Sequence, residues 1–148
     1  MKKTILSLSE KDTKKAGSDI ALEILEIDHK KAVIISLSGD LGAGKTAFTK
    51  GFLTGFGVKS RVTSPTFVVM KRYPVKKGGF KNVYHLDLYR IADSKELDIL
   101  GFKRILDDPQ NIVLIEWPEK GGRLKPNIKV LITHLLEENR RKIDIVRV

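Results

Sequence analysis

The chain has 148 residues, a formal net charge of +10 and no cysteine, which excludes disulfides and thiolate metal sites. Its length suits a single domain, residues 1–148, that buries about two-thirds of its unfolded surface. Because the longest apolar runs are only strand-length and no signal-like stretch opens the chain, we expect a cytoplasmic protein without a membrane span.

The predicted elements alternate between strands and helices, which is typical of a three-layer α/β domain. Ser9 is a good N-cap for a helix that we expect to run to about His29. Continuous apolar runs at 32–37 and 112–116 predict central strands covered on both faces. The expected elements, in chain order, are a short strand at 4–8, a helix at 10–29, a strand at 32–37, a helix at 47–56, a hairpin of 68–73 with 82–88, helical segments at 94–100 and 102–106, a strand at 112–116, a flexible loop at 120–126 and a hairpin of 128–136 with 142–148.

A glycine-rich loop between the strand at 32–37 and the next helix matches G-x-x-x-x-G-K-[ST], the pattern of the phosphate-binding loop. Glycines let successive amides turn toward phosphate oxygens, and the following helix adds the positive end of its dipole. Lys45 suits the β- and γ-phosphates of a nucleotide, and the Thr46 hydroxyl suits a bridging Mg²⁺ ion. The order of strand, loop and helix predicts a P-loop NTPase-like domain with a mixed central sheet and a C-terminal β-hairpin. The loop residues are Gly39, Asp40, Leu41, Gly42, Ala43, Gly44, Lys45 and Thr46.

Two carboxylates stand where predicted strands run out into loops. They are Asp87 and Glu116. In open α/β sheets the ligand lies beyond the carboxyl ends of the strands, so both are candidates to hold a metal or to orient the attacking water. The structural alternatives are a solvated strand end for Glu116 and a salt bridge from Asp87 to Arg90. His85 alternates with Asp87 on one face, and we interpret it as structural.

The sequence favours ATP over GTP. Residues 98–101 spell the D-x-x-G of GTPases, but they lie in a helical stretch instead of after a strand, and no N-K-x-D motif occurs. A hydroxyl-rich turn holding Thr63, Ser64 and Thr66 has two interpretations: a switch loop that senses the γ-phosphate, or an ordinary turn.

A basic stretch separates the phosphate loop from the first carboxylate. Seven lysines or arginines and no acidic residue lie between Lys59 and Lys81. The stretch indicates either contact with nucleic acid or an acidic partner, or a solvated lysine-rich surface without base-stacking aromatics. We find no arginine finger outside it, so we expect slow hydrolysis by the isolated chain and a site that a partner completes.

Four blocks of the chain together resemble one family. They are GDLGAGKTAF at 39–48, VTSPTF at 62–67, HLDLYR at 85–90 and IEWPE at 115–119. Their order and spacing are similar to those of the bacterial TsaE, or YjeE, family. The resemblance covers about residues 13–126. It implies an ATPase that works with the TsaB and TsaD proteins to form threonylcarbamoyladenosine beside the anticodon of certain tRNAs.

The resemblance also implies roles for individual residues. It assigns Thr46 and Glu116 to the binding of magnesium. It assigns Asp87 to the catalytic neighbourhood, where it is a further candidate to bind the metal. Lys45 joins the two carboxylates as a catalytic residue. The loop at 63–66, with Thr66, would respond to nucleotide.

Two further regions border the expected nucleotide. Trp117, the single tryptophan, falls at the rim of the site, where filling a core gap is the alternative. The start of the first helix, near Glu10 and Thr13, would border the adenine.

Two other functions compete with a partner-dependent ATPase. A small-molecule kinase would need an acceptor pocket and a lid, for which little chain is available. A nucleotide-dependent binding module would use ATP only to order a loop, and Asp87 and Glu116 argue against it.

Overall fold

The computed structural model describes residues 1–40, 42–59, 69–137 and 139–148, and within these ranges seven strands form one mixed sheet. The strand order is β1-β7-β6-β2-β5-β4-β3. The strands are β1 (Lys2–Ser7), β2 (Val33–Ser38), β3 (Met70–Lys77), β4 (Phe80–Asp87), β5 (Asn111–Glu116), β6 (Ile128–His134) and β7 (Arg141–Arg147).

The centre of the sheet is parallel and its two edges are antiparallel. Strand β2 pairs in parallel with β5 and β6, and β5 pairs in parallel with β4. The β3–β4 and β6–β7 hairpins and the β1–β7 pair are antiparallel. The predicted mixed sheet, both hairpins and the two central strands are therefore confirmed.

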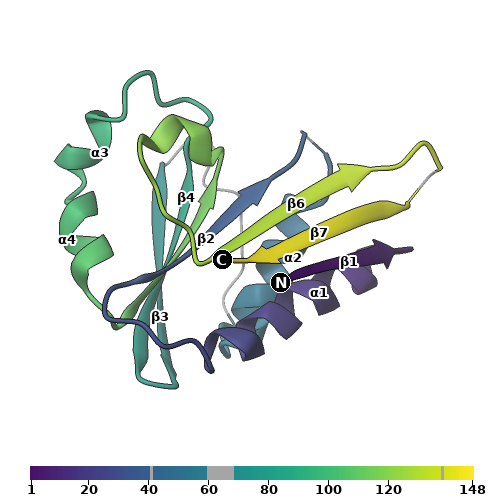
Figure 1. Ribbon diagram of the computed structural model, residues 1–148, viewed down its shortest axis with the longest axis horizontal. Coiled ribbons are helices and arrows are strands. Elements are labelled where there is room, and N and C mark those ends of the chain that lie inside the picture. The colour runs from purple at the N-terminus through teal and green to yellow at the C-terminus, as the bar shows by residue number, and fades with distance from the viewer. Residues whose placement is uncertain (41, 60–68, 138) are drawn as a thin grey trace.

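Helices cover both faces of the sheet, so the predicted three layers are confirmed (Figure 1). The long helices α1 (Glu10–Ile24) and α2 (Lys45–Gly55) lie on one face, and the short helices α3 (Glu96–Ile99) and α4 (Phe102–Asp107) lie on the other. Successive side chains of a strand point to opposite faces, and in β5 Leu114 joins the core under α1 and α2 while Val113 joins the core under α3 and α4.

Close packing of α1 on α2 brings the start of α1 to the phosphate loop. A Cβ atom at Gly17 would overlap the carbonyl oxygen of Phe48, and one at Gly51 would overlap that of Lys14. Only glycine permits this approach of the two backbones. Three phenylalanines spaced four residues apart are buried beneath this helix pair: Phe48, Phe52 and Phe56.

Two predicted boundaries are wrong. Helix α1 ends at Ile24 and not near His29, because Leu25 and Glu26 bond to carbonyls three residues earlier and tighten the last turn. The chain then leaves the helix and the His29 ring stacks on Phe80, with the ring centroids 5.1 Å apart. The predicted flexible loop at 120–126 overlaps a 3₁₀ helix, η1 (Pro118–Gly121), which proline favours at its first turn.

Candidate functional site

The phosphate loop joins the end of β2 to the start of α2. Gly42 and Gly44 have φ angles of 79° and 110°, which residues with a Cβ rarely adopt, so the glycine pattern has a conformational cause. Gly44 is the N-cap of α2, and the helix begins directly at Lys45. The backbone amides of its first turn are therefore free for a ligand. Leu41 lies outside the described residues.

A cavity of about 610 Å³ opens beside this loop. Several residues that the sequence singled out meet at its lining, although they come from two helices, two strands and two loops. Gly39 and Asp40 line a smaller neighbouring cavity of about 190 Å³ together with Lys45 and Trp117, and Ala43 is buried behind the loop. Thr63, Ser64 and Thr66 lie outside the described residues. The larger cavity is lined by Ser9, Glu10, Thr13, Gly42, Gly44, Lys45, Thr46, Ala47, Lys50, Asp87, Tyr89, Arg90, Glu116, Trp117, Asn139 and Arg141.

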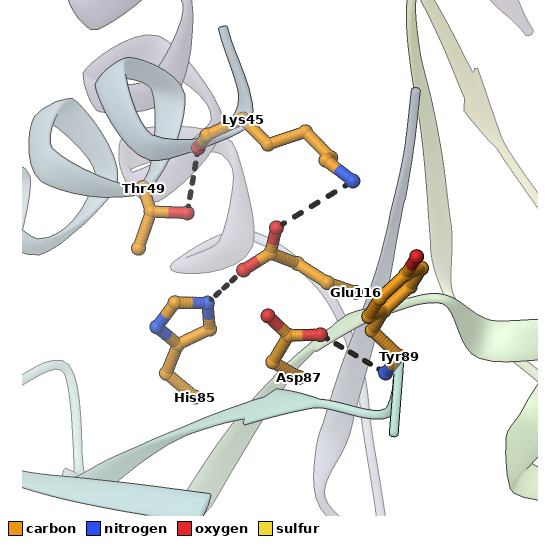
Figure 2. A network of polar contacts seen from close by, with 6 residues as sticks. All are labelled: Lys45, Thr49, His85, Asp87, Tyr89 and Glu116. Atoms are coloured by element: carbon orange, nitrogen blue, oxygen red, sulfur yellow. Dashed lines mark hydrogen bonds and ion pairs between the residues drawn. The ribbon is translucent and has the colours of Figure 1, made fainter. Parts of the chain in front are cut away.

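Glu116 connects the phosphate-loop lysine to a buried histidine (Figure 2). Its Oε1 lies 3.9 Å from the Lys45 ammonium, and its Oε2 lies 2.7 Å from His85 Nε2. All three side chains are almost completely buried, at 5% exposure for Glu116, 7% for Lys45 and 1% for His85. A carboxylate is stable at such depth only when it is paired, and here it has a partner for each oxygen.

The second carboxylate lies beside the first. In the parallel β4–β5 pair, Asp87 is the register partner of Glu116, so the carboxyl ends of both strands meet at one edge of the sheet, as the sequence predicts. Asp87 Oδ1 accepts a hydrogen bond from the Tyr89 backbone N–H at 3.0 Å. This local turn bond fixes the carboxylate at the cavity wall.

Trp117 lines the cavity and also packs against the core under α3 and α4. A place at the rim of the site and a place against the core therefore each describe part of its surroundings. The Lys45 ammonium lies 4.6 Å from the centroid of the Trp117 ring, and the centroid of the Tyr89 ring lies 5.0 Å from it. The Trp117 backbone has φ 57° and ψ 54°, an unfavourable conformation for a bulky residue. Such strain clusters at functional sites.

At the start of α1, Thr13 lines the cavity, and its hydroxyl already has a hydrogen-bond partner within the protein. The Thr13 hydroxyl lies 2.7 Å from the Ser7 hydroxyl, and its methyl group would lie 3.6 Å from a Cβ at Gly44. Thr13 therefore offers packing at the expected adenine side, while Ser9 and Glu10 supply the exposed polar groups there.

The sequence missed three contributors to this site. His85, interpreted as structural, bonds directly to Glu116. Arg90 and Arg141 line the cavity, although we identified no candidate arginine finger outside the basic stretch. The alternation of His85 with Asp87 was a usable signal for the histidine, whereas nothing local marks Arg141, which reaches the loop from the far end of the chain.

The side chains present fit a magnesium ion. Among the described residues no group of three or more His, Cys, Asp or Glu side chains gathers as a metal site. Mg²⁺ needs no such group, because it keeps several waters and binds through one or two carboxylates plus substrate phosphates. Thr46, Asp87 and Glu116 supply suitable oxygen atoms around one cavity.

Fold and site together define the class of this protein as a P-loop NTPase-like α/β domain. The family model described as threonylcarbamoyl adenosine biosynthesis protein TsaE matches residues 7–143. The chain belongs to the TsaE family, as the four sequence blocks indicate.

Curated relatives and a solved structure agree with this membership. The chain is similar to the tRNA threonylcarbamoyladenosine biosynthesis protein TsaE of Haemophilus influenzae, with 37% identity over 88% of this chain and 80% of the relative. The TsaE protein of Aquifex aeolicus is 37% identical over 98% of this chain and 96% of its own length. The crystal structure of Bacillus subtilis YdiB superposes with a TM-score of 0.74 and 27% identity, covering 100% of this chain and 86% of that one.

No helix in the described ranges is both long and apolar enough to cross a membrane.

Proposed function

We propose that this protein binds Mg-ATP in the cavity beside the phosphate loop and hydrolyses it slowly. The observation that carries the proposal is the meeting of Lys45, Asp87 and Glu116 at the carboxyl edge of the parallel strands. A cation for the phosphates and two carboxylates for metal and water are the groups that phosphoryl transfer to water needs.

Each residue has a role in the proposed reaction. Lys45 neutralises the β- and γ-phosphate oxygens, and Asp87 orients the attacking water and accepts its proton. Water oxygen bonds to the γ-phosphorus, the bond from that phosphorus to the β,γ-bridging oxygen breaks, and ADP and phosphate leave. The magnesium ion, when bound, supplies charge neutralisation at the phosphates. Thr46 and Glu116 are its proposed ligands, and Asp87 is a further candidate.

The arrangement of Lys45, Glu116 and Trp117 supports a specific event on nucleotide binding. The Lys45 ammonium faces Glu116 at 3.9 Å and the Trp117 ring at 4.6 Å. A triphosphate would draw the ammonium toward its own oxygens and leave Glu116 held by His85. The carboxylate would then be free to face the metal.

In the cell, the proposed task is to support the TsaB and TsaD proteins in forming threonylcarbamoyladenosine in tRNA. Family membership and the names of the relatives support this assignment. Contact with tRNA is proposed to occur through the complex, and the proposed location is the cytoplasm. The cavity lining includes the exposed Tyr89, which suits a site that a partner closes.

The deciding experiment is ATP turnover by the purified chain, alone and with the TsaB, TsaD and tRNA of its own organism. We expect slow release of phosphate by the chain alone and strong stimulation by the complete set. Transfer of the γ-phosphate to a metabolite would instead establish a kinase. Tight ATP binding with no turnover in any mixture would establish a binding module.

A further inference from the structure

Arg141, at the start of β7, contacts the phosphate loop from outside the motif. Its Nε donates a hydrogen bond to the carbonyl oxygen of Ala43 at 2.8 Å. A Cβ at Gly44 would lie 3.6 Å from the same Nε, so the guanidinium lies directly against the loop. The side chain is half-buried and lines the cavity.

In the part of the chain that the structure describes, Arg141 has no acidic partner. Within the described residues no carboxylate lies within 4.0 Å of its guanidinium, and its other hydrogen bond runs from Nη1 to the Arg140 carbonyl at 3.4 Å. Arg140 itself is paired with Glu137 at 2.7 Å, so the two neighbouring arginines differ in this respect. A half-buried guanidinium that lines a cavity and has no counter-ion among the described residues is suited to an anion that comes from solution.

The sheet order brings Arg141 and the Lys45 ammonium to the loop from opposite sides. Strand β5, which carries Glu116, lies on one side of β2, and β7 lies two strands away on the other side. The Lys45 ammonium points toward Glu116, on the β5 side, whereas Arg141 arrives from the β7 side. A phosphate-loop lysine serves the β- and γ-phosphates, so the β7 side corresponds to the α-phosphate.

We propose that Arg141 is a second cationic residue of the nucleotide site: it holds the phosphate loop through the Ala43 carbonyl and binds the α-phosphate with its remaining N–H groups. This inference rests on the proposed ATP binding. Arginine suits the double task because its planar fork can spend Nε on the carbonyl and still present Nη donors to a phosphate. Lysine, with a single ammonium, would serve only one of the two partners well.

The test uses the full chain and compares Arg141→Ala and Arg141→Gln with Arg147→Ala, a matched control at the other end of β7 that does not line the cavity. Glutamine keeps an N–H donor for the Ala43 carbonyl but removes the charge, and it also serves if the alanine variant does not fold. Calorimetry gives the affinities for ATP and ADP, and steady-state kinetics give kcat and KM.

Both Arg141 variants are expected to lose about 10-fold to 100-fold in affinity, equally for ATP and ADP, with kcat nearly unchanged. The ³¹P resonance of the α-phosphate of bound ADP should move relative to wild type while the β resonance stays. Lys45→Ala should instead weaken ATP more than ADP.

The outcomes separate the two proposals. If wild type binds no nucleotide, the proposed function fails. If wild type binds ATP in a Lys45-dependent manner and the Arg141 variants match Arg147→Ala, only this inference is overturned. It is also overturned if kcat falls at unchanged affinity, or if only the β resonance moves.

Discussion

At the scale of single residues, the site is a chain of buried charges. Lys45, Glu116 and His85 are each almost fully buried, and each contact is made by side chains from different elements. Removing one member therefore leaves another without its partner in a low-dielectric environment, where that loss is largest.

Lys45→Ala is expected to lower ATP turnover by about 100-fold to 1,000-fold, because a preorganised charge at the β- and γ-phosphates is lost. Phosphate release under saturating Mg-ATP measures this effect. Lys103→Ala, on an exposed position of α4, is the control and should behave as wild type. Unchanged turnover in the Lys45 variant would remove the basis for the phosphate-loop interpretation.

Glu116→Gln and Asp87→Asn should retain measurable ATP binding and lose hydrolysis by about 100-fold, since each keeps its shape but loses the charge directed at metal or water. Binding by calorimetry and turnover by phosphate release separate the two effects. Asp98→Asn, an exposed carboxylate in the D-x-x-G tetrapeptide, is the control. Normal turnover in both site variants would mean that the catalytic carboxylate lies elsewhere.

His85→Leu should lower both stability and turnover, because Glu116 Oε2 loses its 2.7 Å hydrogen-bond partner. Leaving a buried acceptor unpaired costs about 1–3 kcal/mol of unfolding free energy. We expect the lower end, since His85 Nδ1 is itself buried without a partner among the described residues and is removed too.

Urea unfolding and ATP turnover measure the two effects, and His134→Leu, on the exposed end of β6, is the control. His85→Gln keeps an N–H donor and should recover part of the turnover. If His85→Leu hydrolyses ATP as wild type does, the histidine has only a packing role.

At the scale of elements, the α1–α2 contact sets the position of the cavity wall. Helix α1 supplies Ser9, Glu10 and Thr13 to the lining, and its place is determined by backbone contact through Gly17 and Gly51. The nucleotide side of α1 therefore depends on two residues that never touch the ligand.

Gly17→Ala and Gly51→Ala should each destabilise the protein, although alanine is the better helix former by about 1 kcal/mol. The added methyl group meets a backbone carbonyl that cannot move aside, and such overpacking costs about 1–3 kcal/mol. Urea unfolding measures directly whether the free energy of unfolding rises or falls, and Lys11→Ala on the exposed face of α1 is the control. A gain in stability in either glycine variant would contradict the packing described above.

At the scale of the whole molecule, the cavity draws on both ends of the chain. Strands β1 and β7 pair with each other, and the first helix and the last strand both reach the phosphate loop (Figure 1). The lysines and arginines of the β3–β4 hairpin lie outside this lining, with Arg72 bonded to Asn82 and Lys77 to the Gly55 carbonyl. They form a separate basic surface, and its contact with tRNA stays a prediction.

Trp117 offers a reporter for the assembled site, because it is the only tryptophan and lies 4.6 Å from the Lys45 ammonium. Mg-ATP should displace that ammonium and shift the intrinsic fluorescence, whereas in Lys45→Ala the shift should be lost. Trp117→Ala should impair stimulation by the partners more than it impairs folding. Flat emission during a titration in which calorimetry detects binding would place the ring away from the nucleotide.

Local sequence patterns were sufficient to predict the order of strands and helices along the chain and the position of the phosphate loop. Glycine conformation, the helix dipole and apolar runs each act over only a few residues. They also predicted that Asp87 and Glu116 share one edge, because parallel strands end together. The hydrogen bond from His85 to Glu116, the contact of Arg141 with Ala43 and the early end of α1 depended on the folded chain. The first two contacts join residues that are 31 and 98 positions apart, and the early helix end arises from packing where the helix stops. The pairing of strands in the sheet decides which of these distant side chains meet.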